Sequence, residues 1–194
     1  MKVLILGLIA LCGLSIYVEC IVVKCNFFDY TCKAMELIMT SKDDRTITGV
    51  TGNHTNGRNN GDVEFFISEP IMYINGKTEH IIKYFPLELA TFLPKLKFVS
   101  ISRSKMAEIH SSDLQQFGEN LETLAIINSE IEVLEADLFQ YNPNLNFIAL
   151  QHNKLKHIED GAFRGLEKLT NLYLENQKQS TCIDGSARNS TEVI

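Results

Sequence analysis

Four consecutive residues carry the side chains of a hydrolase triad, namely His110, Ser111, Ser112 and Asp113. In such a triad an acid orients a histidine, which takes a proton from a nucleophilic hydroxyl group. The three side chains must converge in space, and neighbours along a chain rarely do. A polar turn accounts for the same residues, so we do not expect catalysis here.

A run of carboxylates offers a second candidate chemistry, because Glu130, Glu132, Glu135 and Asp137 carry the oxygen atoms that hard cations bind. These residues alternate with apolar ones, which is typical of a solvated face beside a hydrophobic core. The sequence contains no zinc-protease, dinucleotide or phosphate-binding motif. We therefore expect no enzymatic activity, no metal and no cofactor.

The elements that carry these residues follow a hydrophobic pattern that occurs four times between Leu96 and Gln177. The four passes read LKFVSISRSKM, LETLAIINSEI, LNFIALQHNKL and LTNLYLENQKQ. They start at Leu96, Leu121, Leu145 and Leu169, so the starts are 25, 24 and 24 residues apart. Positions 1, 4 and 6 are apolar in every pass, and position 11 is apolar in the first three. The spacing of positions 4 and 6 predicts a short strand with one buried face.

This pattern is similar to the leucine-rich repeat, L-x-x-L-x-L-x-x-N-x-L. A late phenylalanine, such as Phe139 or Phe163, resembles the extracellular 24-residue class and the small secreted repeat proteins of arthropods. The resemblance implies an α/β-type solenoid, which is a short horseshoe with a parallel β-sheet on its concave face. A single coil cannot bury its own apolar side, so each coil depends on its neighbours and both ends need a cover.

Position 9 departs from the family pattern. The family usually has a buried asparagine there, whereas this chain has Ser104, Ser129, Asn153 and Gln177. Serine has a shorter side chain with one hydrogen to donate. We therefore expect a looser ladder in the first two coils, and we expect the fourth unit to lose the pattern after Leu174.

The first 20 residues are typical of a secretory leader. One lysine precedes an apolar run from Val3 to Val18, which is short for a membrane span. We expect residues 1–20 to be a signal peptide that is cut after Ser15 or after Cys20, and hence a secreted, extracellular protein. A retained membrane anchor is the alternative.

The cleavage site decides the number of cysteines. A cut after Ser15 leaves Cys20, Cys25, Cys32 and Cys182, whereas a cut after Cys20 leaves three. Secretion favours disulfides over a metal site. The stretch CNFFDYTC resembles the amino-terminal cap of extracellular repeat proteins, and we predict a disulfide between Cys25 and Cys32. Cys182 then stays free or links two chains into a dimer.

The repeats set the boundaries of the three segments that follow the signal peptide. We assign residues 21–95 to the cap and an irregular first coil, residues 96–177 to the four repeats, and residues 178–194 to a polar tail. Within the cap we expect a strand over residues 35–39 with a return strand over residues 46–50. Phe65 and Ile67 are predicted to be the inward pair of the irregular coil. Asn53 and Asn189 begin sequons in polar stretches, so both are predicted glycosylation sites of a secreted protein.

The concave face supplies the predicted binding site, because positions 2, 3, 5, 7 and 8 point outward there. Phe147 and Tyr173 lie one coil apart with small residues between them, and aromatic anchors above a flat floor suit a protein-binding patch. The alternative is that they are isolated exposed apolar residues. The predicted binding residues are Phe98, Arg103, Ile127, Phe147, His152 and Tyr173.

The charge of the chain narrows the class of partner. The net charge is −6, and no stretch is basic enough for nucleic acid. We expect a module that recognises an extracellular protein, and the family resemblance implies innate immune recognition or cell-surface signalling. The alternatives are a matrix component without a dedicated ligand and a fragment of a receptor ectodomain.

Overall fold

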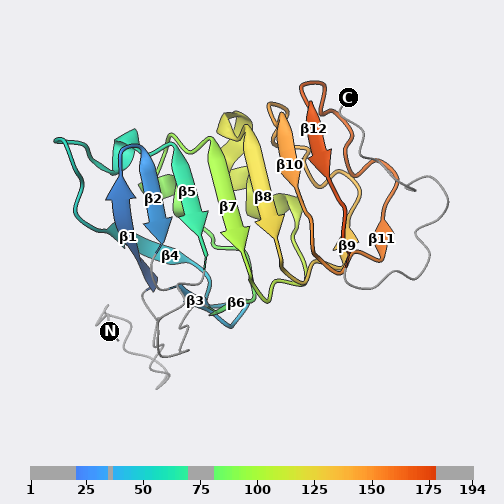
Figure 1. Ribbon diagram of the computed structural model, residues 1–194, viewed down its shortest axis with the longest axis horizontal. Coiled ribbons are helices and arrows are strands. Elements are labelled where there is room, and N and C mark those ends of the chain that lie inside the picture. Colours follow the sequence, from blue (N-terminus) through green and yellow to red (C-terminus); the bar gives the residue numbers. More distant parts are fainter. Residues whose placement is uncertain (1–20, 35–36, 70–80, 178–194) are drawn as a thin grey trace, which may run out of the picture.

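The computed structural model describes residues 21–34, 37–69 and 81–177. The predicted signal peptide, the polar tail, Cys182 and Asn189 lie outside these residues. The described coils stack into a solenoid along the longest axis of the molecule, with one sheet running through all of them (Figure 1). Among the described residues no helix has the length and apolar content needed to cross a membrane.

The main sheet has eight strands in the order β12-β10-β8-β7-β5-β2-β1-β4. All neighbouring strands in it are parallel except β1 and β2, which form an antiparallel pair. Its strands are β1 (Ile21–Phe28), β2 (Thr31–Ala34), β4 (Ile47–Thr51), β5 (Phe65–Ser68), β7 (Phe98–Ser102), β8 (Thr123–Ile127), β10 (Phe147–Ala149) and β12 (Asn171–Tyr173).

Short elements return the chain along the opposite side of each coil. They are β3 (Ile38–Met39), η1 (Asn60–Asp62), β6 (Ile81–Ile82), α1 (Leu89–Phe92), α2 (Ser111–Leu114), η2 (Gln115–Asn120), β9 (Val133–Leu134) and β11 (His157–Ile158). Two small parallel ladders, β3 with β6 and β9 with β11, join neighbouring coils on this side. We call it the convex side.

The predicted repeat positions form the hydrophobic core. In the first three passes all the side chains at positions 1, 4, 6 and 11 are buried, from Leu96 at 1% exposed to Leu155 at 1%. In the fourth pass Leu169, Leu172 and Leu174 are only partly buried, although they pack against the same core. The difference arises because no further coil lies against them among the described residues. The predicted parallel solenoid is therefore confirmed.

The amino-terminal cap is part of the main sheet. The hairpin of β1 and β2 places Cys25 and Cys32 side by side, and the predicted disulfide between them is present. Val23, Phe27 and the two cysteines all point into the core. The hairpin thus covers the first coil with backbone hydrogen bonds as well as apolar surface.

Two predictions in the cap are wrong. Residues 47–51 do form a strand, but β4 pairs in parallel with β1 and not with residues 37–39, the described part of the predicted first strand. Residues 38–39 join the convex ladder with β6. The arrangement buries Ile47 and Val50, and it adds a partner strand to β1 on the side away from β2.

The second error is the predicted inward pair Phe65 and Ile67. Phe65 is 39% exposed, whereas Phe66 and Ser68 are fully buried. A shift of one residue exchanges the two faces of a strand. Val63, Phe66 and Ser68 have the spacing of repeat positions 1, 4 and 6, and Phe66 aligns with Val99 in β7. The sequence pattern did not reveal this irregular repeat, because position 6 holds Ser68 where the pattern has an apolar residue.

The position-9 side chains connect neighbouring coils, and they do so in two ways. Asn153 Nδ2 donates to the carbonyl oxygens of Ile126 (2.6 Å) and Leu150 (2.8 Å), and Asn153 Oδ1 accepts from the Ile131 N–H (3.2 Å). Ser104 and Ser129 instead bond to each other, with 2.8 Å between their hydroxyl oxygens. Ser129 Oγ also accepts from the Ser104 N–H (3.2 Å), so the serines connect two coils through each other and not through the more distant backbone groups that Asn153 reaches.

Gln177 corrects the expectation that the pattern ends at Leu174. Its amide nitrogen donates to Leu150 (3.0 Å) and Leu174 (2.6 Å), and its amide oxygen accepts from the Leu155 N–H (3.1 Å). These are the three bonds of Asn153 moved along by one coil. Glutamine, with the same amide group, therefore fills the position of asparagine in the fourth unit.

A buried ion pair fastens the cap to the repeats. Arg45 Nη1 lies 2.7 Å from Asp113 Oδ1, and the two side chains are 12% and 1% exposed. Arg45 also donates to the Phe85 carbonyl oxygen, and the second oxygen of Asp113 accepts from the His110 N–H. The pair joins the segment before β4 to the turn that begins α2, 68 residues later.

The position-9 contacts predict the effect of Asn153→Ala. The change leaves two buried carbonyl oxygens and one N–H without their partner, so we expect a loss of about 2–4 kcal/mol in the free energy of unfolding. Urea denaturation measures it. Asn146→Ala is the control, because the Asn146 contacts that hold the coils use its backbone oxygen and survive the change. Equal stability of both variants would contradict this role of Asn153.

The ion pair predicts the effect of Asp113→Asn. Removing one charge leaves Arg45 buried without a counter-charge, so we expect a loss of about 3–5 kcal/mol. Lys42→Ala is the matched control, since it breaks the exposed pair of Lys42 and Glu108 and should leave the unfolding curve in place. A double change of Arg45→Met and Asp113→Leu should recover part of the loss. A single variant as stable as the control would refute the argument.

Candidate protein-binding surface

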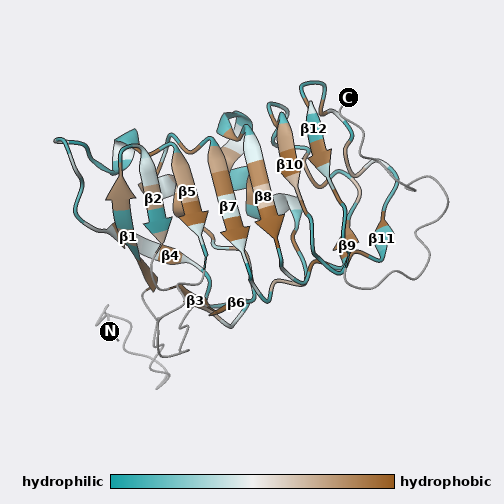
Figure 2. Cartoon of the chain, viewed as in Figure 1, coloured by the Kyte–Doolittle hydropathy of each residue, from teal (hydrophilic) through white to brown (hydrophobic). Residues whose placement is uncertain are grey.

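The outer face of the main sheet brings the outward columns of the repeats into register. Phe98 lies beside Phe65 on one strand and Thr123 on the other, and Phe147 lies between Thr123 and Asn171. Brown apolar stretches recur in every strand of the main sheet and alternate there with paler or teal residues, while the connections between strands contain more teal residues (Figure 2). The outer face is thus a continuous surface with no insertion between coils from β7 to β12.

Two aromatic contacts stand on this surface. The rings of Phe147 and Tyr173 have centroids 5.3 Å apart with a tilt of 42° between their planes. The rings of Phe65 and Phe98 lie 5.6 Å apart with a tilt of 45°. The first contact unites two predicted binding residues. The second includes Phe65, which sequence reasoning had placed in the core.

Small side chains separate the two aromatic contacts. Thr123 stands between Phe98 and Phe147 in the same column, and Ala125 and Ala149 in the next column are 8% and 5% exposed. Two strand spacings of about 4.8 Å each put the Phe98 and Phe147 backbones roughly 10 Å apart. The surface is therefore a shallow floor with an aromatic ring on either side.

The middle of this surface carries no charge. We define the central floor as positions 3, 5 and 7 of the first three repeats, and none of these nine residues is charged although charged residues make up 22% of the chain. A surface core depleted of charge is what distinguishes protein interfaces from other surface. The central floor consists of Phe98, Ser100, Ser102, Thr123, Ala125, Ile127, Phe147, Ala149 and Gln151.

Charged residues lie around the central floor. Lys33 and Glu69 form an ion pair of 3.5 Å where β2 and β5 end, and Lys97 lies 3.6 Å from Glu64 where the next strands begin. The four side chains are 32–46% exposed, so water screens both ion pairs and each adds little to stability. The arrangement is an apolar centre with a charged border on its amino-terminal side.

The structure adds aromatic residues that the sequence did not reveal. Phe28 is 73% exposed and Tyr30 is 44% exposed, at the turn between β1 and β2. Phe28 pairs with Thr31, which in turn lies beside Phe65. The available sequence signal was the alternation of apolar residues in β1, which ends at Phe27 and therefore places Phe28 on the outer face. These residues extend the aromatic surface toward the amino-terminal end of the sheet.

Arg103 and His152 have a backbone role that the sequence did not predict. Both have positive φ angles, 53° and 57°, and so do Asn128 and Asn176 at the same repeat position. The Arg103 N–H donates to Ile127 of the next coil (3.0 Å), and the His152 N–H donates to Glu175 (3.2 Å). The left-handed turn ends each strand, and both side chains remain exposed at the border of the outer face.

The residues with triad-like side chains serve the structure. The Nδ1 atom of His110 lies 3.1 Å from Glu135, and its Nε2 atom lies 3.6 Å from Glu108. Asp113 binds Arg45, as described above. The histidine and the aspartate thus face different partners on the convex side, which leaves no arrangement that activates a serine.

The carboxylate run is neutralised by bases from adjacent coils. Glu130 lies 2.9 Å from Lys105 and 3.0 Å from Lys154, and these hydrogen bonds lower the pKa of Glu130. Glu132 pairs with Lys156 and Asp137 with Arg164 in the same way. The run is therefore a solvated face with ion pairs across the coils, as its spacing predicted.

Comparison with known proteins supports the repeat assignment. A family model described as leucine rich repeat matches residues 119–178. No curated protein matches the chain. The period, the buried positions and this match together show a leucine-rich repeat fold in the solenoid of residues 96–177. The model covers the second and third repeats and most of the fourth.

Three solved structures are similar to the chain at low sequence identity. The complex of TLR13 with ssRNA13 shares 21% identity at a TM-score of 0.47, covering 71% of this chain and 22% of that one. The Drosophila Toll–Spatzle complex gives 18% identity, a TM-score of 0.49 and coverage of 71% and 18%. Internalin C2 of Listeria monocytogenes gives 15%, 0.36, and coverage of 63% and 59%. The chain spans about a fifth of the length of the first two.

The contacts of His110 predict a pH dependence of stability. Burial lowers the pKa of His110, but the hydrogen bond and charge of Glu135, with the charges of Asp113 and Glu108, outweigh it and raise the pKa above the usual value. A raised folded-state pKa stabilises the fold at pH below the unfolded value of about 6.5, and this contribution is lost as the pH rises through the folded value.

We therefore expect the protein to be more stable at pH 6 than at pH 8.5 by an amount that disappears in His110→Gln. Thermal unfolding of both proteins across this range measures the difference. His152→Gln is the control, because His152 is exposed at the border of the outer face. The assignment fails if His110→Gln keeps the full pH dependence of the native protein.

Proposed function

We propose that this protein is secreted and binds another protein through the outer face of its main sheet, with the central floor as the centre of contact. The observation that carries the proposal is the uncharged central floor between two aromatic contacts. Interfaces between proteins have such centres, and a few buried aromatic residues supply most of their binding energy.

The position of the anchors supports a partner that is itself folded or extended across several coils. Phe65, Phe98, Phe147 and Tyr173 span five neighbouring strands from β5 to β12. At about 4.8 Å per strand the anchors cover roughly 20 Å, which is longer than a small molecule needs. Exposed Phe28 and Tyr30 continue the surface by two more strands.

The side chains on the outer face of the main sheet contribute little to the contacts that hold the coils together, so they can be selected for binding. The coils are held together by backbone hydrogen bonds, by position-9 side chains and by the core on the other face of the sheet. Side chains on the outer face contact each other and solvent. Such separation supports binding over a structural role without a dedicated ligand, and over enzymatic activity.

The biological setting rests on family resemblance. Small extracellular repeat proteins take part in innate immune recognition and cell-surface signalling, and we propose the same setting here. The apolar leader and the disulfide between Cys25 and Cys32 support secretion, since disulfides persist in oxidising compartments.

The proposal predicts that Phe147→Ser weakens partner binding by about 1–3 kcal/mol, which is a loss of about 5- to 150-fold in affinity. The melting temperature should change little, because the side chain stands on the outer face. Val133→Ser is the matched control, since Val133 is a 37% exposed apolar residue of β9 on the convex side.

The experiment captures the partner with the secreted protein and both variants, in parallel, from the fluid into which the protein is released. Mass spectrometry identifies a stoichiometric partner, and calorimetry then measures the three affinities. A partner that is retained by Val133→Ser and weakened by Phe147→Ser supports the proposal. Loss with Val133→Ser and retention with Phe147→Ser would place the binding site on the convex side.

A further inference from the structure

Asn53 stands at the amino-terminal edge of the main sheet. It follows the edge strand β4 by two residues and begins the sequon Asn53-His54-Thr55. The side chains of Asn53 and Thr55 are exposed, as glycosylation requires of both. No described residue forms a hydrogen bond with the Asn53 side chain, so its amide nitrogen is available for modification.

The middle residue of the sequon holds the loop in place. The His54 ring stacks on Phe27 with 3.6 Å between centroids and 21° between planes. His54 Nε2 lies 2.7 Å from Asn60 Oδ1, and Asn60 Nδ2 donates to the Val50 carbonyl oxygen. The loop is therefore anchored through His54, while the residues on either side of it point to solvent.

The backbone approaches β1 closely just before the sequon. Gly52 has a φ of 152°, and a side chain at this position would collide with the Cys25 carbonyl oxygen and with the Phe27 ring. Glycine is required because no larger residue fits both the angle and the space. This approach sets Asn53 beside the disulfide-bonded end of the hairpin.

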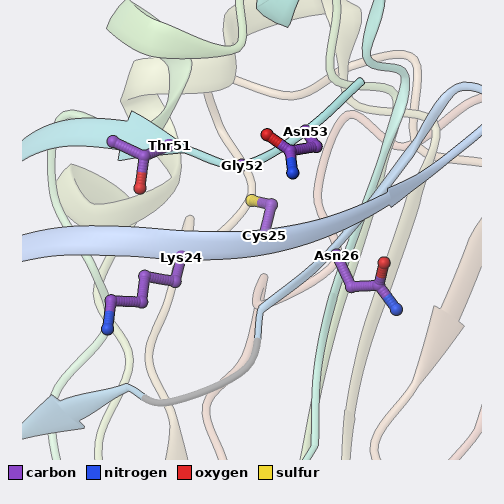
Figure 3. Close-up of a pocket in the computed structure, with 6 residues that line it drawn as sticks. All are labelled: Lys24, Cys25, Asn26, Thr51, Gly52 and Asn53. Atoms are coloured by element: carbon purple, nitrogen blue, oxygen red, sulfur yellow. The ribbon is translucent and has the colours of Figure 1, made fainter. Parts of the chain in front are cut away.

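A hollow of about 350 Å³ lies at this point, lined by Lys24, Cys25, Asn26, Thr51, Gly52 and Asn53 (Figure 3). It forms because β4 pairs with β1 only as far as Thr51 opposite Lys24, and the rest of β1 extends beyond it. The hydroxyl of Thr51 lies on the same side of β1 as Asn53 and suits the hydroxyl groups of a sugar, while Lys24 and Asn26 point to the opposite side of β1 (Figure 3).

We propose that Asn53 carries an N-linked glycan whose first sugar rests in this hollow. In the transfer, Asn53 Nδ2 forms a bond to the anomeric carbon of a sugar on a lipid pyrophosphate donor, loses one proton, and the lipid pyrophosphate leaves. The inference rests on the proposed secretion of the chain but not on binding by the outer face. A glycan here adds cover at the carboxy-terminal end of the edge strand β4, whose first residue already pairs with Leu87, and so opposes pairing with another chain.

The position also leaves the proposed binding surface open. Asn53 lies beside β1 and β4, whereas the central floor lies on β7, β8 and β10, three or more strands further along the sheet. A glycan at the edge therefore limits contact at one end of the sheet only. A partner on the central floor has free access from the carboxy-terminal side.

The test expresses the full chain in a eukaryotic secreting cell and maps the peptides of the released protein before and after treatment with peptide N-glycosidase. We expect the peptide with Asn53 to appear only after treatment, with Asn53 converted to aspartate. Thr55→Ala should abolish the modification at Asn53 and Thr55→Ser should retain it. The backbone carbonyl oxygen of Thr55 accepts a hydrogen bond from the Arg58 N–H, and both variants keep this contact of the folded loop.

The outcomes distinguish the proposed glycan at Asn53 from the proposed secretion of the chain. A released protein with unmodified Asn53 overturns the glycan and leaves secretion in place, whereas a chain that stays inside the cell overturns both. The second readout is amide hydrogen exchange of residues 22–28 and 49–53, which should be slower in the glycosylated protein than in the enzymatically deglycosylated one. Equal exchange would show that the glycan extends into solvent and does not rest in the hollow.

Discussion

The stacking of one coil on the next is the constraint on which the rest of the structure depends. At position 2 a single carbonyl oxygen accepts two N–H groups from the following coil, as when Lys97 accepts from Glu122 and Thr123. Glu122 and Asn146 repeat the same contact with their own neighbours. A coil without a neighbour would leave these groups and its apolar face in water, so no repeat is stable alone.

This constraint assigns different tasks to the faces of the solenoid. The inner face of the sheet is apolar because it must fill the space between coils, while the convex side joins the coils through ion pairs such as Lys156 with Glu132. The outer face is bound by neither requirement. It can therefore hold half-buried aromatic rings such as Phe147 and Tyr173, which the proposed binding of a partner protein would use.

The two ends of the array satisfy the same constraint differently. At the amino-terminal end the two strands of a disulfide-bonded hairpin and β4 extend the sheet by three strands beyond the first coil, and Arg45 reaches Asp113 to fix them. At the other end Gln177 completes the contacts of the fourth coil, while Leu172 and Leu174 remain half-buried. Within the described residues, three strands cover the amino-terminal end of the array, and Gln177 is the last residue that connects the fourth coil to the third.

Periodicity determined the core positions from Leu96 to Leu155 and the outward direction of Phe147 and Tyr173, because period-2 spacing sets which face a strand residue occupies. The parallel solenoid followed from the resemblance to the leucine-rich repeat. The family resemblance added the disulfide of the cap. Only the tertiary structure decided the inward direction of Phe66, the partner of β4 and the contact of Arg45 with Asp113. These three features depend on contacts between residues that are far apart in the sequence and outside the regular repeat. No local sequence pattern indicates which of several possible contacts gives the folded chain its lowest free energy.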